Sequence, residues 1–269
     1  MIYETIPLKQ QGSLPNACAV TYFISHSDRI GIVKRPIIVI CPGGGYEHLS
    51  DREGEMTALQ FNSMGYHAIV VKYSVAPATY PTALYELAGV IAMIYEKADE
   101  WHVDTEKIVV QGCSAGGHLA ASFCMNWSKP FLSEALHVPS AQLKPAGMML
   151  NYPVITSGPF SHSGSFVNLL GDRYEELKES MSLENQVNED TPKAFIWHTF
   201  TDASVPVENS LLLVSALRQH HISTEFHMYP HGEHGLGLAN ELTATPEGTG
   251  MQAECTSWIT LAHTWLQNL

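Results

Sequence analysis

The chain has 269 residues, of which 45% are hydrophobic and 15% charged, so it carries enough apolar material for a large core in one α/β domain. Its 14 Lys and Arg residues face 27 Asp and Glu residues, which gives a formal net charge of -13 at pH 7. Because such a chain repels phosphate groups, the composition argues against nucleic acids and anionic membrane surfaces as partners.

The cysteine pattern indicates a reducing environment. The five cysteines are odd in number, widely spaced and contain no C-x-x-C motif, which favours free thiols over a disulfide framework or a zinc site. The first residues lack the basic start and the apolar run of a signal peptide. The sequence also contains no run of 18 apolar residues, so no membrane span is predicted. We therefore expect a cytoplasmic protein without a membrane partner, whose oligomeric state the sequence leaves open.

The first third of the chain predicts strands at 17–24 and 35–41. The second strand is apolar on both faces, as in a parallel sheet that helices cover on both sides. A helix at 51–64, a strand at 66–73 and a helix at 81–97 follow. Because no helix separates the first two strands, we expect an antiparallel edge at the N-terminal side of the sheet.

Strands and helices alternate through the rest of the chain, which predicts right-handed crossovers and a mainly parallel sheet. One segment interrupts the alternation: residues 156–190 are rich in Ser, Gly and Glu, with a convincing helix only at 173–180. This segment is equally consistent with a lid and with a plain surface insertion. The later elements are expected at 146–152, 193–199 and 224–229 for strands and at 207–220 and 251–266 for helices.

One short motif carries the strongest indication of chemistry. After the apolar segment 108–110, the chain continues as Gly112-Cys113-Ser114-Ala115-Gly116 and then enters a helix-forming stretch. This is the G-x-S-x-G nucleophile elbow in its expected context between a strand and a helix, where the glycines permit a tight turn. We therefore predict that Ser114 is the nucleophile of a hydrolase.

A serine nucleophile needs a histidine base and a carboxylate that orients the histidine. In α/β-hydrolases the three residues follow one another along the chain as serine, acid and histidine. Asp202 lies just past the expected strand 193–199, and His234 lies in a Gly-rich loop past the expected strand 224–229. These positions predict a triad of Ser114, Asp202 and His234.

Other acids and bases are less well placed. Asp190 precedes its strand and Asp172 lies in the insertion, whereas His231 remains an alternative base in the same loop as His234. We favour His234, because the following Gly235 permits a turn toward the serine. The His-x-x-His spacing also suggests a metal, but no helix or H-E-x-x-H motif supports one, so neither metal nor cofactor is expected. The histidines expected to be surface or structural residues are His118, His198, His220 and His221.

A glycine-rich loop follows the expected strand 35–41, with the sequence Pro42-Gly43-Gly44-Gly45-Tyr46. Consecutive glycines let backbone N–H groups approach a substrate oxygen without hindrance from side chains. A phosphate loop is not indicated, because neither G-K-[ST] nor G-x-G-x-x-G is present. We predict an oxyanion hole made by Gly44, Gly45 and Ala115.

Together these motifs resemble the bacterial α/β-hydrolases of the acetyl esterase/lipase type, the group that includes acetyl-xylan and feruloyl esterase-like enzymes. The resemblance implies a mainly parallel central sheet with helices on both faces, and carboxylic-ester hydrolysis with Ser114, Asp202 and His234 as the triad. One departure is Ser74, since related chains often carry arginine at this usually structural position. The matching segments are Pro42–Tyr46, Arg52–Glu55, Tyr73–Pro77, Gly112–His118, Asp202–Pro206 and His234–Gly235.

We expect a single domain over residues 1–269 that cleaves short-chain carboxylic esters, with acetylated sugars among the candidates. A peptidase on the same fold is an alternative, but peptidases usually add a further domain that this chain is too short to hold. A non-catalytic binding protein is a second alternative, although such proteins typically lose the serine or the histidine. The sequence does not identify the natural acyl or alcohol group.

Overall fold

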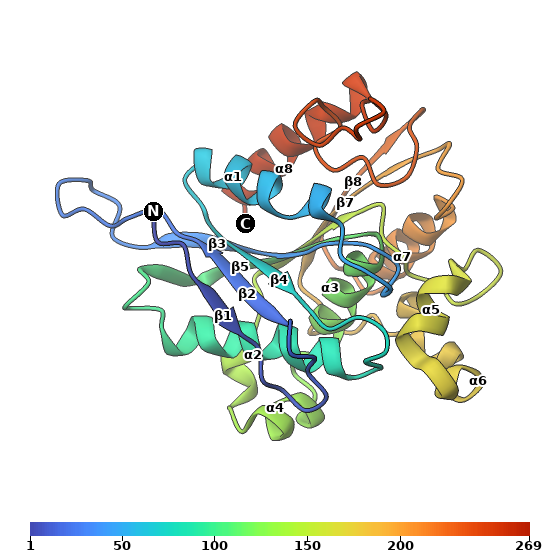
Figure 1. The fold of residues 1–269 in the computed structure, drawn as a ribbon, viewed down its shortest axis with the longest axis horizontal. Coiled ribbons are helices and arrows are strands. Elements are labelled where there is room, and N and C mark those ends of the chain that lie inside the picture. Colours follow the sequence, from blue (N-terminus) through green and yellow to red (C-terminus); the bar gives the residue numbers. More distant parts are fainter.

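The computed structural model describes residues 1–269, and its centre is one eight-stranded sheet (Figure 1). The strands from β3 to β8 are parallel, whereas β1 and β2 form an antiparallel edge, as predicted. In spatial order the strands are β1 (Thr5–Pro7), β2 (Cys18–Tyr22), β4 (His67–Lys72), β3 (Arg35–Cys41), β5 (Val103–Cys113), β6 (Gly147–Asn151), β7 (Lys193–Thr199) and β8 (Thr224–Tyr229).

Side chains of the central strands alternate between two hydrophobic cores. On β3, Ile37 and Val39 belong to the larger core of 46 buried residues, whereas Ile38 and Ile40 belong to the smaller core of 23. This alternation follows from the two-residue period of a strand. In Figure 1, α1 (Glu55–Ser63) and α8 (Trp258–Gln267) cover one face. The larger core packs under α2 (Thr82–Glu96), α3 (Ser114–Asn126), α4 (Pro130–Leu136) and α7 (Glu208–Gln219).

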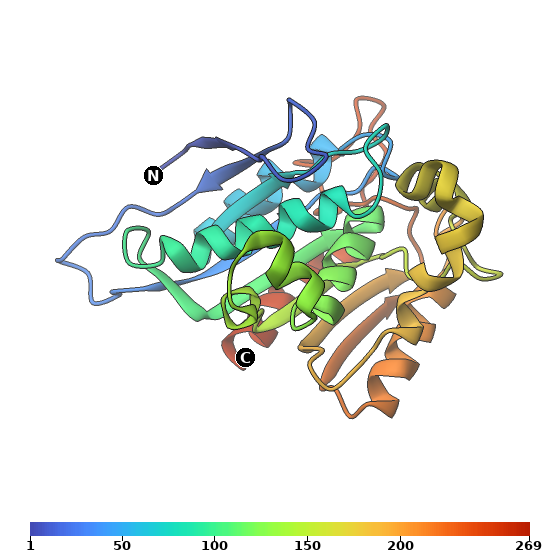
Figure 2. The same cartoon turned by 90° about the horizontal axis from the view of Figure 1, so that it is seen from below.

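The insertion is more helical than the sequence predicted. A helix at Ser163–Leu170 (α5) was not expected, and the predicted helix at 173–180 consists of a short α6 (Tyr174–Leu177) between 3₁₀ turns. The α5 segment buries Phe166, Leu169 and Leu170 against the larger core. Tertiary burial therefore stabilises a helix that is only eight residues long and would be marginal by itself. Figure 2 shows α5 and α6 together at one end of the molecule.

Two further predicted helices begin differently. Gly54 separates a 3₁₀ turn at Asp51–Glu53 from α1, and a 3₁₀ turn at Ala253–Ser257 precedes α8.

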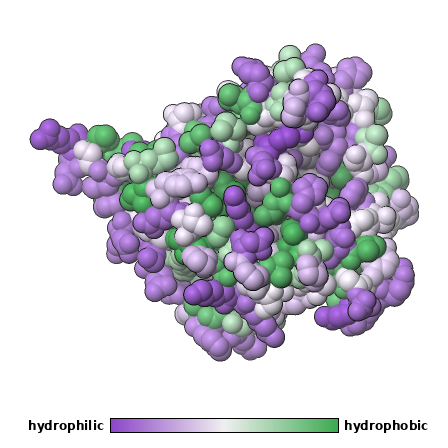
Figure 3. Space-filling view, viewed as in Figure 1, coloured by the Kyte–Doolittle hydropathy of each residue, from purple (hydrophilic) through white to green (hydrophobic).

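Hydrophobic residues on the face seen in Figure 3 are scattered among hydrophilic ones. No helix combines the length and the apolar character needed to cross a bilayer.

Candidate active site

The loops that carry the predicted site residues all leave the same edge of the sheet. β3 leads into the glycine-rich loop, β5 into Ser114, β7 into the Asp202 loop and β8 into the His234 loop. Because the carboxyl ends of parallel strands meet at one edge, residues far apart in sequence converge there. The topology therefore places the four predicted parts of the site within reach of one another.

Ser114 sits in a strained backbone conformation at the junction of β5 and α3. Its φ of 53° lies in the left-handed region, which side chains other than glycine rarely adopt. The turn depends on close backbone packing, because a Cβ on Gly112 would collide with the backbone of Gly116 and a Cβ on Gly116 with that of Cys41. This is the sharp elbow that the G-x-S-x-G motif predicted.

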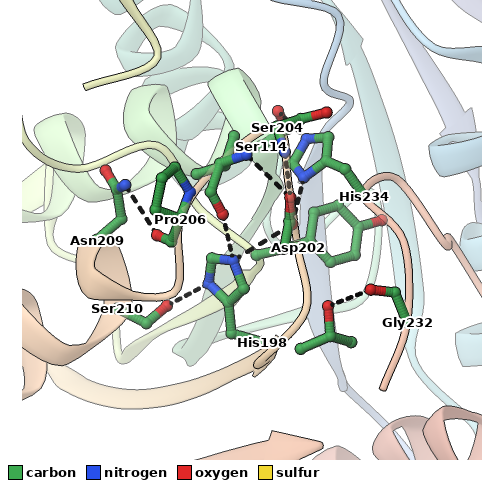
Figure 4. A network of polar contacts seen from close by, with 12 residues as sticks. Ser114, His198, Asp202, Ser204, Pro206, Asn209, Ser210, Gly232 and His234 are labelled. Atoms are coloured by element: carbon green, nitrogen blue, oxygen red, sulfur yellow. Dashed lines mark hydrogen bonds and ion pairs between the residues drawn. The ribbon is translucent and has the colours of Figure 1, made fainter. Parts of the chain in front are cut away.

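A hydrogen-bonded relay joins the three predicted triad residues (Figure 4). The Nε2 atom of His234 lies 2.7 Å from Ser114 Oγ, and its Nδ1 atom lies 2.6 Å from Asp202 Oδ2. A carboxylate only accepts hydrogen bonds, so Nδ1 carries the proton and Nε2 is free to accept the serine proton. The imidazole is thus held in the tautomer that a general base requires.

Asp202 is buried and has four polar partners. Its Oδ1 atom accepts from the N–H groups of Ser204 and Val205, each at 2.9 Å, and its Oδ2 atom lies 3.3 Å from His198 Nε2 in addition to His234. Burial by itself raises the pKa of Asp202, but the hydrogen bonds from His198 and His234 outweigh it and hold the pKa well below its usual range. The carboxyl is therefore ionised at neutral pH.

Two backbone donors of the glycine-rich loop are unused within the protein. The N–H groups of Gly44 and Gly45 donate to no protein acceptor, whereas that of Gly43 donates to Glu53 at 2.8 Å. Ala115 lies in the first turn of α3, where N–H groups have no acceptor within the helix. These three residues could together bind a negatively charged oxygen beside Ser114.

The relay opens into a polar pocket of about 300 Å³. None of the residues that line it has an apolar side chain. One of them, His162, comes from the insertion, and Asn168 of α5 donates to the carbonyl of Gly45 at 2.9 Å. The lining residues are Gly44, Gly45, Glu47, His48, Ser50, Arg52, Glu53, Ser114, His162, Ser204, His234 and Gly235.

The alternative site residues lie elsewhere. His231 is exposed, and Asp190 accepts a hydrogen bond from Ser128 on the surface. Asp172 is also exposed, in a 3₁₀ turn of the insertion. No group of three or more His, Cys, Asp or Glu side chains is arranged to hold a metal ion.

Sequence reasoning missed the side chains that support the relay. His198 is a structural histidine, as expected, but it also binds Asp202, while its Nδ1 atom lies 2.8 Å from Ser210 Oγ. Tyr152 was predicted only as the end of a strand, yet its ring lies edge-on to His234 with centroids 5.2 Å apart. Glu53 belonged to a matching motif without an assigned role. Of these residues, only His198 could have been identified from the sequence, because it lies on β7 just before the Asp202 loop.

Comparison with known proteins shows which family this chain resembles. The BD-FAE family model matches residues 29–217. The chain is 34% identical over 235 residues to endo-1,4-beta-xylanase B of Butyrivibrio fibrisolvens and 30% identical over 208 residues to an acetylxylan esterase of Xylanibacter ruminicola. These matches cover 86% and 75% of this chain, but only 36% and 41% of the relatives. The chain thus spans about two fifths of the length of these curated relatives.

Solved structures match over nearly their whole length. An acetyl ester-xyloside bifunctional hydrolase from Caldicellulosiruptor lactoaceticus is 33% identical with a TM-score of 0.83, and the match covers 98% of this chain and 96% of that one. A carboxylesterase from Lactobacillus plantarum is 31% identical with a TM-score of 0.85, covering 100% and 98%. The predicted α/β-hydrolase fold is therefore confirmed.

Proposed function

Because this chain belongs to the BD-FAE family, we propose that it is a serine esterase that removes short acyl groups, acetyl above all, from the hydroxyl groups of sugars. It is a carboxylesterase-like α/β-hydrolase, as its relatives and structural neighbours indicate. The triad of Ser114, Asp202 and His234 and the sugar substrate are the specific parts of the proposal.

One observation carries the triad assignment: the continuous relay from Ser114 Oγ through His234 to Asp202, with bonds of 2.7 and 2.6 Å. In the proposed reaction, Ser114 Oγ attacks the ester carbonyl while its proton moves to His234 Nε2. The carbonyl oxygen becomes an oxyanion, which the N–H groups of Gly44, Gly45 and Ala115 stabilise.

The tetrahedral intermediate then collapses and yields an acyl-enzyme. The C–O bond of the ester breaks, and the departing alkoxide takes the proton from His234. A water molecule next gives a proton to His234 and attacks the acyl carbonyl. The bond from the carbonyl carbon to Ser114 Oγ then breaks, and Ser114 Oγ takes the proton back from His234 as the carboxylic acid leaves. Throughout, the ionised Asp202 stabilises the imidazolium that forms on His234.

The pocket favours a sugar as the alcohol part of the ester. Its lining offers hydroxyl, carboxylate, imidazole and guanidinium groups and no apolar side chain, which suits a ligand covered with hydroxyl groups. Two similar proteins are named as an acetylxylan esterase and as an acetyl ester-xyloside hydrolase. Both lines of reasoning support acetylated xylo-oligosaccharides as the substrate class.

Acetate release from acetylated xylo-oligosaccharides and hydrolysis of p-nitrophenyl acetate test the proposal together. We expect the wild type to cleave both, and Ser114→Ala to lower kcat by about a millionfold with an unchanged melting temperature. Ser133→Ala, on α4 outside the pocket, serves as the matched serine control. Activity of Ser114→Ala within tenfold of the wild type would contradict the triad, and cleavage of the aryl ester alone would contradict the sugar substrate.

A further inference from the structure

Glu53 is a buried carboxylate that the proposed reaction does not use. It ends the 3₁₀ turn before α1, and only 2% of its surface is exposed. No Lys, Arg or His lies within ion-pair distance. Removing a carboxylate from water without a cationic partner is costly unless strong hydrogen bonds compensate. The position of Glu53 in the wall of the active-site pocket suggests what those bonds accomplish.

One carboxylate oxygen holds the glycine-rich loop. Glu53 Oε2 accepts the N–H of Gly43 at 2.8 Å, directly before the two residues with unused N–H groups. Gly43 is wedged tightly in place, because a Cβ there would lie 2.7 Å from Glu53 Oε2 and 2.9 Å from the Cβ of Ser114. The bond to Glu53 therefore sets how closely the loop approaches the nucleophile.

The other oxygen holds the histidine loop through a tyrosine. Glu53 Oε1 accepts the hydroxyl of Tyr152 at 2.8 Å, and the same hydroxyl accepts the N–H of Gly237 at 2.9 Å. Burial, together with the nearby Cys113 and Glu53, raises the pKa of Tyr152 well above its usual range. The hydroxyl therefore keeps its proton and donates a hydrogen bond to Glu53. The Tyr152 ring in turn packs edge-on against His234, with an angle of 73° between the rings.

We propose that Glu53 is a positioning residue that ties the oxyanion-binding loop to the loop of the general base through its two carboxylate oxygens. This inference rests on the proposed esterase function. Because each carboxylate oxygen accepts a separate donor, one buried side chain can fix the distance between the oxyanion donors and His234. Misplacement of such groups by about 1 Å can cost up to about 100-fold in rate.

Glu53→Gln tests the inference, because it keeps the size of the side chain but presents an NH₂ group to one of the two donors. We expect kcat for p-nitrophenyl acetate to fall by about 10- to 100-fold while KM changes by less than about threefold. Glu55→Gln is the matched control, since Glu55 is exposed and also accepts a tyrosine hydroxyl, that of Tyr22 at 3.0 Å. Its kcat should equal that of the wild type.

Tyr152→Phe removes the hydroxyl that connects Glu53 to Gly237, and it should lower kcat in the same way. The double variant with Glu53→Gln should lose little more than the worse single variant, because both changes break one connection. Titration of active sites with an organophosphate separates positioning from folding. We expect nearly all Glu53→Gln molecules to react eventually, each with a reduced kcat.

Three results would overturn the inference. They are an unchanged kcat in Glu53→Gln, fully additive losses in the double variant, and a reduced number of titratable sites that each keep the wild-type kcat. The last result would mean that Glu53 serves only folding. None of these results would contradict the esterase proposal, which Ser114→Ala tests separately.

Discussion

Two histidines share one carboxylate in the candidate site, and their roles differ. His234 connects Asp202 to Ser114. His198 is wholly buried, and its Nε2 atom lies 2.9 Å from Val205 O and 3.3 Å from Asp202 Oδ2. His198 therefore contacts the carboxylate of Asp202 and not Ser114. Such outer contacts keep the acid in the orientation that the imidazole needs.

His234→Ala and His231→Ala should separate the base from its neighbour in the loop. Only His234 lies within hydrogen-bond distance of Ser114, and His231 is exposed. Loss of a general base lowers kcat by at least about 10²-fold, so His234→Ala should be nearly inactive and His231→Ala should keep most of its activity. The measurement is kcat for p-nitrophenyl acetate at neutral pH, and the reverse ranking would refute the choice of base.

Asp202→Asn should lower kcat by up to about 10⁴-fold without loss of the fold, because an amide cannot stabilise the imidazolium and favours the wrong tautomer of His234. Asp190→Asn is a suitable control, since Asp190 lies at the opposite end of β7 and binds only surface groups. Steady-state kinetics of both variants decide the matter. A benign Asp202→Asn would exclude this residue as the triad acid.

Within the insertion, α5 is the helix that contacts the site. It contributes Asn168, which binds the Gly45 carbonyl, and it follows His162, which lines the pocket. Its apolar residues point into the core and not into the pocket, apart from Val167, which is exposed. The insertion thus adds one polar side chain, His162, to the pocket lining, and the lid and the plain surface insertion both stay predictions.

The polar lining of the whole pocket predicts a preference for short acyl groups. A long acyl chain gains about 0.8 kcal/mol for each buried CH₂ only where an apolar channel receives it, and the pocket has no apolar side chain. We expect kcat/KM to peak between acetyl and butyryl esters and to stay flat or fall beyond them. A p-nitrophenyl ester series from acetate to dodecanoate measures this, and a maximum at octanoate or longer would reveal an apolar channel.

For the protein as a whole, two buried histidines connect stability to pH. Burial lowers the pKa of His118 and of His67 to about 4 from the ordinary value of 6.5. The Nδ1 atom of His118 lies 3.0 Å from the Tyr46 hydroxyl, and its Nε2 atom lies 3.1 Å from the Met181 carbonyl oxygen. Protonation of either ring in the folded protein would place an unpaired charge in the interior.

The free energy of unfolding should therefore fall as the pH drops from 6.5 to 5.0. In this window the unfolded chain takes up protons at both histidines while the folded chain stays largely unprotonated there, which costs about 1.5 kcal/mol for each. Urea midpoints across this range measure the effect, and His118→Gln should weaken the pH dependence. A constant midpoint over the window would contradict the prediction.

Local sequence patterns were enough to predict most of the sheet and the parts of the candidate site. The predicted strands 193–199 and 224–229 have the bounds of β7 and β8, because alternating and apolar runs reflect only neighbouring residues. The elbow around Ser114 can likewise be recognised from adjacent residues, because its glycine spacing is a local motif. The crowding at Gly116, in contrast, comes from Cys41 on the neighbouring strand β3. The insertion was misjudged because the short α5 depends on burial against residues distant in the chain.

Only the tertiary structure decided which groups meet. His234 and not His231 reaches Ser114 across 120 residues, and Glu53 binds Tyr152 across 99 residues. Such contacts depend on the order of the strands in the sheet and on the exact course of each loop, which no pattern of neighbouring residues records. The motifs of the chain identified the candidate triad residues, while the packing at the edge of the sheet determined which buried carboxylate, Glu53, contacts both the glycine-rich loop and Tyr152.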